Sequence, residues 1–114
     1  MIQIFGTKKC KDTQKAIRFF KERNIQIHYV DLQEKAISRG ELNNIRRSVA
    51  LDDLIDRNGK QYIKRNLQYM KFDIESELLD DQLLFKTPIV RFQQKAAVGH
   101  QPEIWQDWAK VIKG

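Results

Sequence analysis

The sequence predicts a single α/β domain in which a β-α-β unit and a β-β-α unit enclose an all-helical segment. The first unit contains an apolar run, an amphipathic stretch and an alternating run, in that order. The middle of the chain is rich in charge and carries short apolar faces at helical spacing. The last unit contains two strand-like runs before a final helical pattern. At 114 residues the chain is long enough for one ordinary core.

The amino-terminal unit contains two strands and one helix. A strand over residues 2–5 precedes a helix from Thr13 to about Arg23, which Asp12 caps and Asn24 ends. The next run alternates apolar and polar residues over Ile25–Val30, which predicts a strand. Because this is a compact β-α-β unit, we expect its two strands to be parallel.

Short helices fill the middle of the chain. Ser38 and Glu41 have the spacing of a capping box, which starts the first helix. A second brief helix over Leu51–Ile55 should end at Asn58-Gly59. Residues 62–70 also favour a helix. Asp73 caps a further one, whose apolar residues are Ile74, Leu78, Leu79 and Leu83.

The carboxyl-terminal unit is a hairpin and a helix. Ile89–Phe92 and Ala96–Val98 are the strands, and Gln93-Gln94 is the turn between them. Pro102 suits the first position of the last helix. That helix should bury an apolar stripe of Ile104, Trp105, Trp108, Val111 and Ile112. This order of elements is the topology of a thioredoxin-like fold with a mixed sheet, whose core would be residues 1–35 and 86–114 and whose helical insertion would be residues 36–85.

Cys10 is the only cysteine and opens the first helix. Free N–H groups and the dipole at a helix start favour negative charge, and Lys8, Lys9 and Lys11 add three cations. Such surroundings lower a cysteine pKa from ~8.5 into the range of roughly 3.5–7.5. The alternative is a small buried residue. The polar, cationic turn before Cys10 favours a reactive thiol.

Composition limits the setting and the partners. One cysteine excludes an intramolecular disulfide, and no apolar segment has the length of a signal peptide or a membrane span, so we expect a cytoplasmic protein. The net charge is +6, and residues 1–23 hold seven basic side chains against two acidic ones. No nucleic-acid-binding motif accompanies this charge, so direct nucleic acid binding is not expected. The carboxylates of residues 75–81 lie near no His or Cys, so no metal site is expected.

Three segments carry a family resemblance. They are Lys9–Ala16, Leu54–Tyr62, and Thr87–Val90 together with Val98-Gly99. In this order and at these separations, the chain resembles the ArsC/Spx family, the arsenate-reductase-like branch of the thioredoxin superfamily, over nearly its whole length. The resemblance implies a nucleophilic cysteine at Cys10 and an oxyanion held by three arginines.

The arginine positions depart from that pattern. Arg57 matches the first arginine, but Thr87 and His100 stand where the family has the other two. Two lost charge-assisted contacts, at roughly 1.5–3 kcal/mol each, would weaken oxyanion binding by about two to four orders of magnitude. We therefore expect arsenate to be a poor substrate. On the alternative reading Arg57 is a surface charge and His100 caps the last helix.

The resemblance also implies a thiol-binding edge. Thr87-Pro88 should be a cis peptide bond facing Cys10, and the Thr87 backbone would pair with an extended thiol ligand such as glutathione. Thr13 stands where a two-cysteine motif has its second sulfur, and its hydroxyl would donate to the thiolate. With one cysteine, an outside thiol must resolve any mixed disulfide. We expect glutathione as co-substrate, or a thiol-containing protein partner, and no bound cofactor.

These features favour a glutathione-dependent thiol oxidoreductase. Lys8, Lys9, Lys11 and Arg57 would attract its anionic substrate. The alternatives are an Spx-like regulator that binds RNA polymerase, and a family member without catalysis. In many Spx proteins a two-cysteine switch occupies the position that Thr13 interrupts here.

Overall fold

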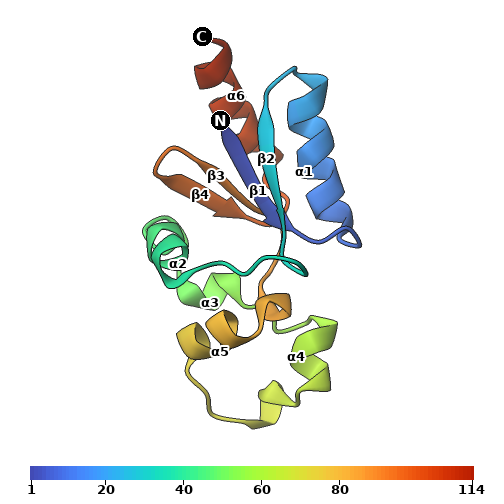
Figure 1. The fold of residues 1–114 in the computed structure, drawn as a ribbon, viewed down its shortest axis with the longest axis vertical. Coiled ribbons are helices and arrows are strands. Elements are labelled where there is room, and N and C mark those ends of the chain that lie inside the picture. The colour runs from blue at the N-terminus through green and yellow to red at the C-terminus, as the bar shows by residue number, and fades with distance from the viewer.

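A computed structural model describes residues 1–114 as a four-stranded mixed sheet with helices around it (Figure 1). The strand order is β2-β1-β3-β4. Strand β1 (Ile2–Gly6) runs parallel to β2 (Ile27–Asp31) and antiparallel to β3 (Ile89–Phe92), and β3 forms a hairpin with β4 (Lys95–Val98). The β-α-β and β-β-α units and the thioredoxin-like fold are confirmed.

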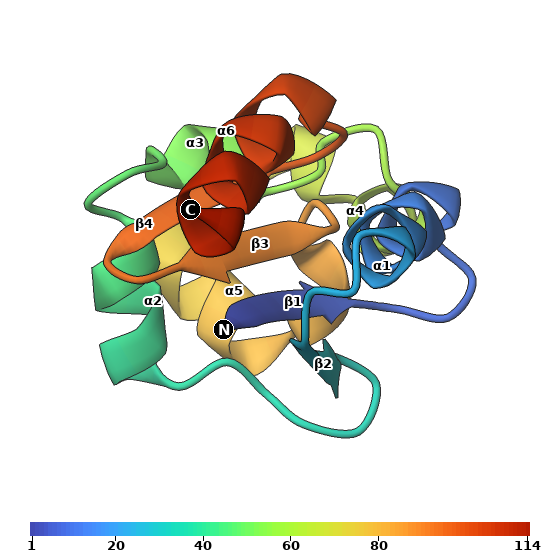
Figure 2. The same ribbon diagram turned by 90° about the horizontal axis from the view of Figure 1, so that it is seen from above.

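Two long helices cover one face of the sheet. Helix α1 (Lys11–Glu22) follows β1, and α6 (Pro102–Lys113) follows β4; Figure 2 shows both on the same side. The alternate strand residues that point toward them are apolar and buried: Ile2, Ile4, Val90 and Phe92. The helices meet this face with Ala16, Phe20, Trp105, Trp108 and Ala109. The two tryptophans therefore belong to the core, as the sequence predicts.

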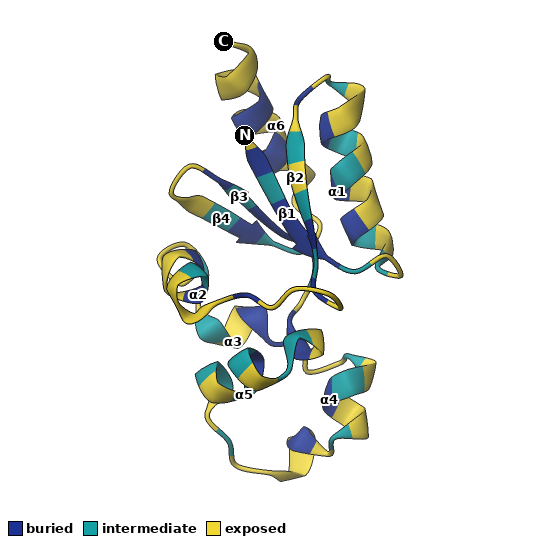
Figure 3. Cartoon of the chain, in the orientation of Figure 1, coloured by how far each residue is buried: buried dark blue, intermediate teal, exposed yellow.

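The opposite face of the sheet is divided into a polar row and an apolar row. The polar row is at least partly exposed: Gln3, His28 and Arg91. The apolar row lies one pleat further along β1 and β2 and is buried: Phe5, Val30 and Ile89. Figure 3 shows burial extending from this end of the sheet into the segment below it. The apolar row thus needs a cover that α1 and α6 do not supply.

The helical insertion provides that cover. Its helices are α2 (Arg39–Ile45), α3 (Leu51–Leu54), α4 (Lys60–Lys64) and α5 (Ile74–Asp80), with single 3-10 turns at Leu67–Tyr69 and Gln82–Leu84. They gather beyond the carboxyl ends of β1 and β2 (Figure 1). The apolar row shares one core with the insertion's Leu42, Ile45, Leu54, Leu78 and Leu84. No helix of the chain is both long and apolar enough to cross a membrane.

The two predicted caps of the insertion are present. Ser38 and Glu41 form a full capping box, in which each side chain accepts a hydrogen bond from the backbone N–H of the other residue. Asp73 accepts from the backbone N–H of Ser76 at 3.0 Å and starts α5. Each capping side chain thus satisfies one of the N–H groups that are left free at the start of its helix.

The prediction that Asp12 caps α1 is wrong. The helix begins at Lys11, and Cys10 is its N-cap residue. The reason is that the Cys10 carbonyl already accepts the first helical hydrogen bond, from the N–H of Gln14 at 3.2 Å. Asp12 lies in the first turn, where its charge still suits the helix dipole. Cys10 is therefore the residue directly before the first helical residue, next to the free N–H groups of the first turn.

Three boundaries in the insertion also differ from the sequence prediction. Helix α3 stops at Leu54 because Ile55 pairs with Phe85 in an isolated antiparallel bridge. Asn58-Gly59 therefore precedes α4 and does not end α3. Asn66, with φ of 56°, separates α4 from the next 3-10 turn, so residues 62–70 are not one helix.

Apolar residues at the ends of two helices are more exposed than predicted. Helix α5 ends at Asp80, which leaves Leu83 in a 3-10 turn and 45% exposed. In α6, Ile104, Val111 and Ile112 are exposed. The last turns of α6 extend past the end of the sheet (Figure 1), so Val111 and Ile112 have no strand to pack against.

Gly6 ends β1 where α1 lies very close to it. A Cβ built on Gly6 would stand 2.3 Å from Thr13 Oγ1 and 2.5 Å from Thr13 Cγ2. Thr13 is fully buried in the first turns of α1. Only glycine at position 6 allows the helix that carries the cysteine to approach the sheet this closely.

We predict that Gly6→Ala lowers the free energy of unfolding by about 1–3 kcal/mol, because the added methyl overlaps Thr13. Urea unfolding followed by circular dichroism measures this. Gly40→Ala is the control, since the nearest atom to its Cβ is Ser38 Oγ at 4.0 Å. The Gly6→Ala/Thr13→Ala double variant should recover part of the loss. Equal stabilities of Gly6→Ala and Gly40→Ala would show that the contact imposes no constraint.

Candidate active site

The site lies at one end of the strands, where three segments of the chain meet. Strands β1 and β2 are parallel, so their carboxyl ends lie side by side. The antiparallel strand β3 begins at the same end of the sheet, directly after Pro88. The loop after β1 carries Cys10. The sheet topology therefore brings Cys10 next to Thr87 and Pro88, although Cys10 and Thr87 are 77 positions apart in the sequence.

Cys10 is held against the segment before β3. Its backbone N–H donates to the Thr7 carbonyl at 3.2 Å, which closes a tight turn after β1. Its thiol donates to the Thr87 carbonyl, with an Sγ–O distance of 3.6 Å. The Thr87-Pro88 bond is cis, as predicted. The Pro88 carbonyl accepts from the N–H of Gly99 at 2.8 Å, which fixes this segment next to the end of β4.

The surroundings of Cys10 favour its thiolate. Burial of the sulfur by itself raises the pKa of the Cys10 thiol. Hydrogen bonds from the side chains of Thr13 and Thr87 and from the backbone N–H groups of Thr13 and Asp12 outweigh it, so the pKa lies below its ordinary value. These donors lie at the N-terminus of α1 and on the segment before Pro88. The sulfur is half-buried, so a substrate can still approach it.

Two hydroxyl groups near this thiol lack partners. The Thr13 hydroxyl is buried and makes no hydrogen bond while the sulfur is a thiol. It gains an acceptor when Cys10 ionises. The Tyr29 hydroxyl on β2 is also buried and unpartnered. Burial raises the pKa of Tyr29, and the negative charges of Asp31, Glu34 and the Cys10 thiolate raise it further. Tyr29 therefore remains a neutral phenol.

A cavity of about 270 Å³ lies beside Thr87, between the cysteine loop and the insertion. We call it the lysine pocket. Its charged lining residues are Lys9, Asp56 and Lys60. Its uncharged lining residues are Thr7, Gln33, Gly59, Gln61, Gln82, Leu83, Phe85 and Thr87. Of the seven predicted anion-binding residues, Lys9 and Thr87 line this pocket.

The other predicted anion-binding residues lie elsewhere, apart from Pro88. Lys8 and Lys11 are exposed and line no cavity. Arg57 is exposed, and its guanidinium donates to Asp52 at 3.1 Å and to the Tyr62 hydroxyl at 3.1 Å. These bonds raise the pKa of Arg57, the one to Tyr62 most. The structure does not bring Arg57 to the thiol.

His100 faces a different cavity. It lies after Gly99, with its ring edge-on to Trp105 at 5.4 Å between centroids. It lines a larger cavity of about 460 Å³ over the edge strand β4, together with Ser48, Asp53 and Lys86. Lys86 lines this cavity and Thr87 lines the lysine pocket, so the segment before Pro88 separates the two. Arg57, His100 and Cys10 therefore do not form one oxyanion site.

The sequence analysis missed Asp56, Lys60 and Tyr29. Asp56 and Lys60 flank the Asn58-Gly59 turn, which the sequence analysis assigned to the end of a helix and to the segment of family resemblance, with no role for these two side chains. A Cβ on Gly59 would stand 2.8 Å from Asp56 Oδ2, so glycine lets this turn fold tightly beside the site. Tyr29 alternates with Val30 along β2, and that alternation places it on the α1 side of the sheet.

Residues 5–108 match the ArsC family. The chain belongs to the ArsC family. A comparison with curated proteins gives no significant match. Among solved structures, the YffB protein is similar with a TM-score of 0.83 and 18% identity, over 96% of this chain and 99% of that one.

Two further solved structures share the fold of this ArsC-family chain. An ArsC-family-related protein from Bacteroides fragilis has a TM-score of 0.78 and 21% identity, over 94% of this chain and 96% of that one. An arsenate reductase from Vibrio cholerae has a TM-score of 0.78 and 17% identity, over 93% and 95%. At these identities the likeness is one of fold, and the site residues stand on their own geometry.

We predict that Thr13→Val raises the pKa of Cys10, because the thiolate loses the hydrogen bond from the Thr13 hydroxyl. A hydrogen bond to a charged group contributes ~1.5–3 kcal/mol. At a pH below the pKa of both proteins, the alkylation rate of the variant should therefore be lower by roughly tenfold or more. The pH dependence of alkylation by iodoacetamide measures this shift in the ArsC-family protein.

Thr13→Ser is the matched control for this shift. It keeps the hydroxyl and should leave the titration near that of the wild type. A titration of Thr13→Val that coincides with the wild type would remove the hydroxyl from the site.

Proposed function

We propose that this protein is a glutathione-dependent thiol oxidoreductase with Cys10 as its single nucleophile. One arrangement carries the proposal: Cys10 Sγ at the N-cap of α1, 3.6 Å from the carbonyl of Thr87, which precedes cis-Pro88. The donors around the sulfur lower the pKa of Cys10, which makes the nucleophilic form available. Thr87 is partly exposed, and its backbone groups are available to an extended peptide thiol.

The reaction proceeds by two thiol–disulfide exchanges. The Cys10 thiolate attacks the glutathione sulfur of a disulfide R–S–S–G, forms a Cys10–S–S–G bond and releases R–S⁻, which takes a proton from solvent. A second glutathione thiolate attacks the glutathione sulfur of that mixed disulfide. Glutathione disulfide leaves, and the Cys10 thiolate is restored. Overall, R–S–S–G and one glutathione thiol become R–SH and glutathione disulfide, so the second glutathione is the reductant and no second protein cysteine is needed.

Thr13 and Thr87 support both steps. Their hydroxyls stabilise the thiolate as attacking group in the first step and as leaving group in the second. A better-stabilised thiolate leaves faster, since leaving-group ability follows thiol pKa. This role requires no metal or bound cofactor. It does require a compartment that supplies reduced glutathione, which agrees with the expectation of a cytoplasmic protein.

Arsenate is the less suitable substrate. An oxyanion with more than one charge needs several strong donors, and arginine forks supply them best. Here Arg57 is bound to Asp52 and Tyr62, and Thr87 and His100 replace the other two family arginines. The arsenate reductase from Vibrio cholerae shares the fold, but this chain lacks a cluster of guanidinium groups at the sulfur.

We predict that the wild type reduces 2-hydroxyethyl disulfide at the expense of glutathione and that Cys10→Ser does not. Coupling glutathione disulfide to glutathione reductase and following NADPH absorbance measures turnover. Mass spectrometry of the wild type exposed to glutathione disulfide should show one glutathione adduct, on Cys10. Lys8→Gln is a control of the same loop, since Lys8 lines no cavity. It should retain turnover within about twofold, because screening weakens exposed charges.

Absence of both turnover and adduct would reject the oxidoreductase. The alternatives would then be an Spx-like regulator that binds RNA polymerase, or a member without catalysis. Co-purification of RNA polymerase with the tagged protein separates those two. Turnover with arsenate that matches turnover with the disulfide would reject the substrate assignment alone.

A further inference from the structure

The lysine pocket contains charges that have no partner in the protein. Neither Lys9 nor Lys60 makes an ion pair or a side-chain hydrogen bond. Asp56 makes no ion pair, and one of its oxygens accepts from the backbone N–H of Asn58 at 3.2 Å. Two ammonium groups and one carboxylate therefore give the pocket a net charge of +1, directly beside the segment that contacts the cysteine sulfur.

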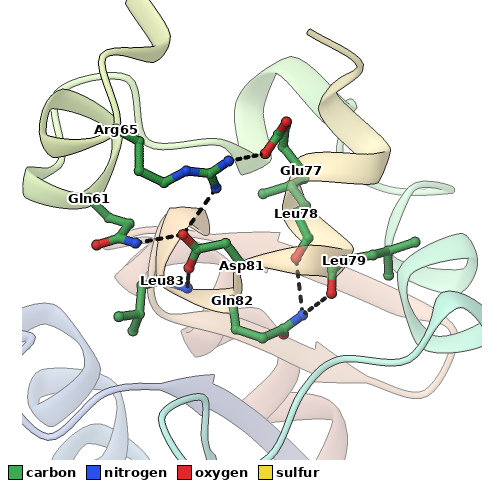
Figure 4. Close-up of polar contacts among 8 residues, drawn as sticks. All are labelled: Gln61, Arg65, Glu77, Leu78, Leu79, Asp81, Gln82 and Leu83. Atoms are coloured by element: carbon green, nitrogen blue, oxygen red, sulfur yellow. Dashed lines mark hydrogen bonds and ion pairs between the residues drawn. The ribbon is translucent and has the colours of Figure 1, made fainter.

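The pocket wall is already built by hydrogen bonds among its other polar groups. Figure 4 shows that Gln61 donates to Asp81, at 2.6 Å, while Arg65 bridges Asp81 and Glu77. Gln82 donates to the Leu78 carbonyl at 3.0 Å and accepts from the Ile37 N–H at 2.6 Å. The side chains of Gln61 and Gln82 are thus committed to the fold. The lysines are the positively charged groups left to bind an anionic ligand.

We propose that the lysine pocket binds one carboxylate of glutathione between Lys9 and Lys60, so that Lys60 sets the preference for glutathione over uncharged thiols. This rests on the proposed function for its substrate. Thr87 connects the cysteine with the lysine pocket, because its carbonyl contacts Cys10 Sγ and the residue also lines the pocket. A glutathione joined to Cys10 would lie over Thr87 and extend one of its ends into the pocket.

The charge and size of the pocket favour a single carboxylate. Its net charge of +1 matches one monovalent group. A doubly charged inorganic oxyanion would also meet the carboxylate of Asp56, which repels it. Cavities that enclose a whole small ligand measure roughly 300–1,000 Å³. At about 270 Å³ the pocket suits one end of a tripeptide.

The first test is binding of S-methylglutathione, which cannot form a disulfide. We expect Lys60→Gln to weaken its binding roughly two- to fivefold, measured by NMR titration at low salt, because an exposed ion pair with the carboxylate is lost. Lys60→Arg should bind nearly as the wild type does. Lys64→Gln is the matched control, since Lys64 lies on the same helix, is exposed and does not line the pocket.

The second test is selectivity in the first exchange step. Lys60→Gln should slow reaction of Cys10 with glutathione disulfide by a similar factor and leave reaction with 2-hydroxyethyl disulfide unchanged. The S-methyl derivatives of glutathione monoethyl ester and of cysteinylglycine identify the bound end. The wild type should bind one of these two derivatives more weakly than it binds S-methylglutathione. Lys60→Gln should bind that derivative and S-methylglutathione equally well.

The outcomes separate the two proposals. Equal binding of S-methylglutathione by Lys60→Gln and Lys64→Gln overturns the pocket assignment, whatever the turnover. Binding that depends on Lys60 together with no exchange at Cys10 supports the pocket and rejects the oxidoreductase. Binding that no ester or truncation weakens in the wild type also overturns the assignment, because then no carboxylate is held.

Discussion

The packing of Phe5, Val30 and Ile89 against the insertion is the contact on which the rest of the structure depends. These side chains form one row across three strands and share a core with the helices of residues 36–85. Burial of an apolar side chain of this size contributes about 1.5–3 kcal/mol. Directly beyond this row, β1 continues into the cysteine loop and Pro88 leads into β3. The same contact that joins the insertion to the sheet therefore fixes the sulfur, Thr87 and the lysine pocket relative to one another.

The thiol owes its character mainly to hydrogen bonding. The sequence argument relied on three nearby lysines, but Lys8, Lys9 and Lys11 are exposed, where solvent and salt screen their charge. The groups that lower the pKa of Cys10 are hydroxyls and backbone N–H groups at fixed positions. Fixed dipoles in a partly buried site act more strongly than mobile surface charges. The lysines are then available for a different task, as Lys9 illustrates.

The fold could be predicted from the sequence because its strands and long helices are strongly patterned. Alternation along β2, the capping box at Ser38 and the proline at the start of α6 are local signals, and each is present in the structure. The boundaries of α3 depend on a tertiary contact, the pairing of Ile55 with Phe85, which no local signal reports.

The candidate site was predictable only in part, for a similar reason. Cys10 and cis-Pro88 follow from local sequence and resemblance. The position of Arg57 depends on its bonds to Asp52 and Tyr62 across a turn, and these direct it away from the thiol. Asp56 and Lys60 enter the site because the Asn58-Gly59 turn folds back toward Thr87, a path set by the insertion as a whole.

The order of strands also affects how the chain is made. Strand β1 lies inside the sheet, with β2 on one side and β3 on the other, and Ile2 pairs with Phe92. During synthesis β2 emerges soon after β1, but β3 emerges only after the whole insertion. Until then β1 presents an open edge of unpaired N–H and C=O groups on an apolar strand, the kind of edge that recruits other chains. The nascent protein is thus most prone to aggregate while the insertion is being translated.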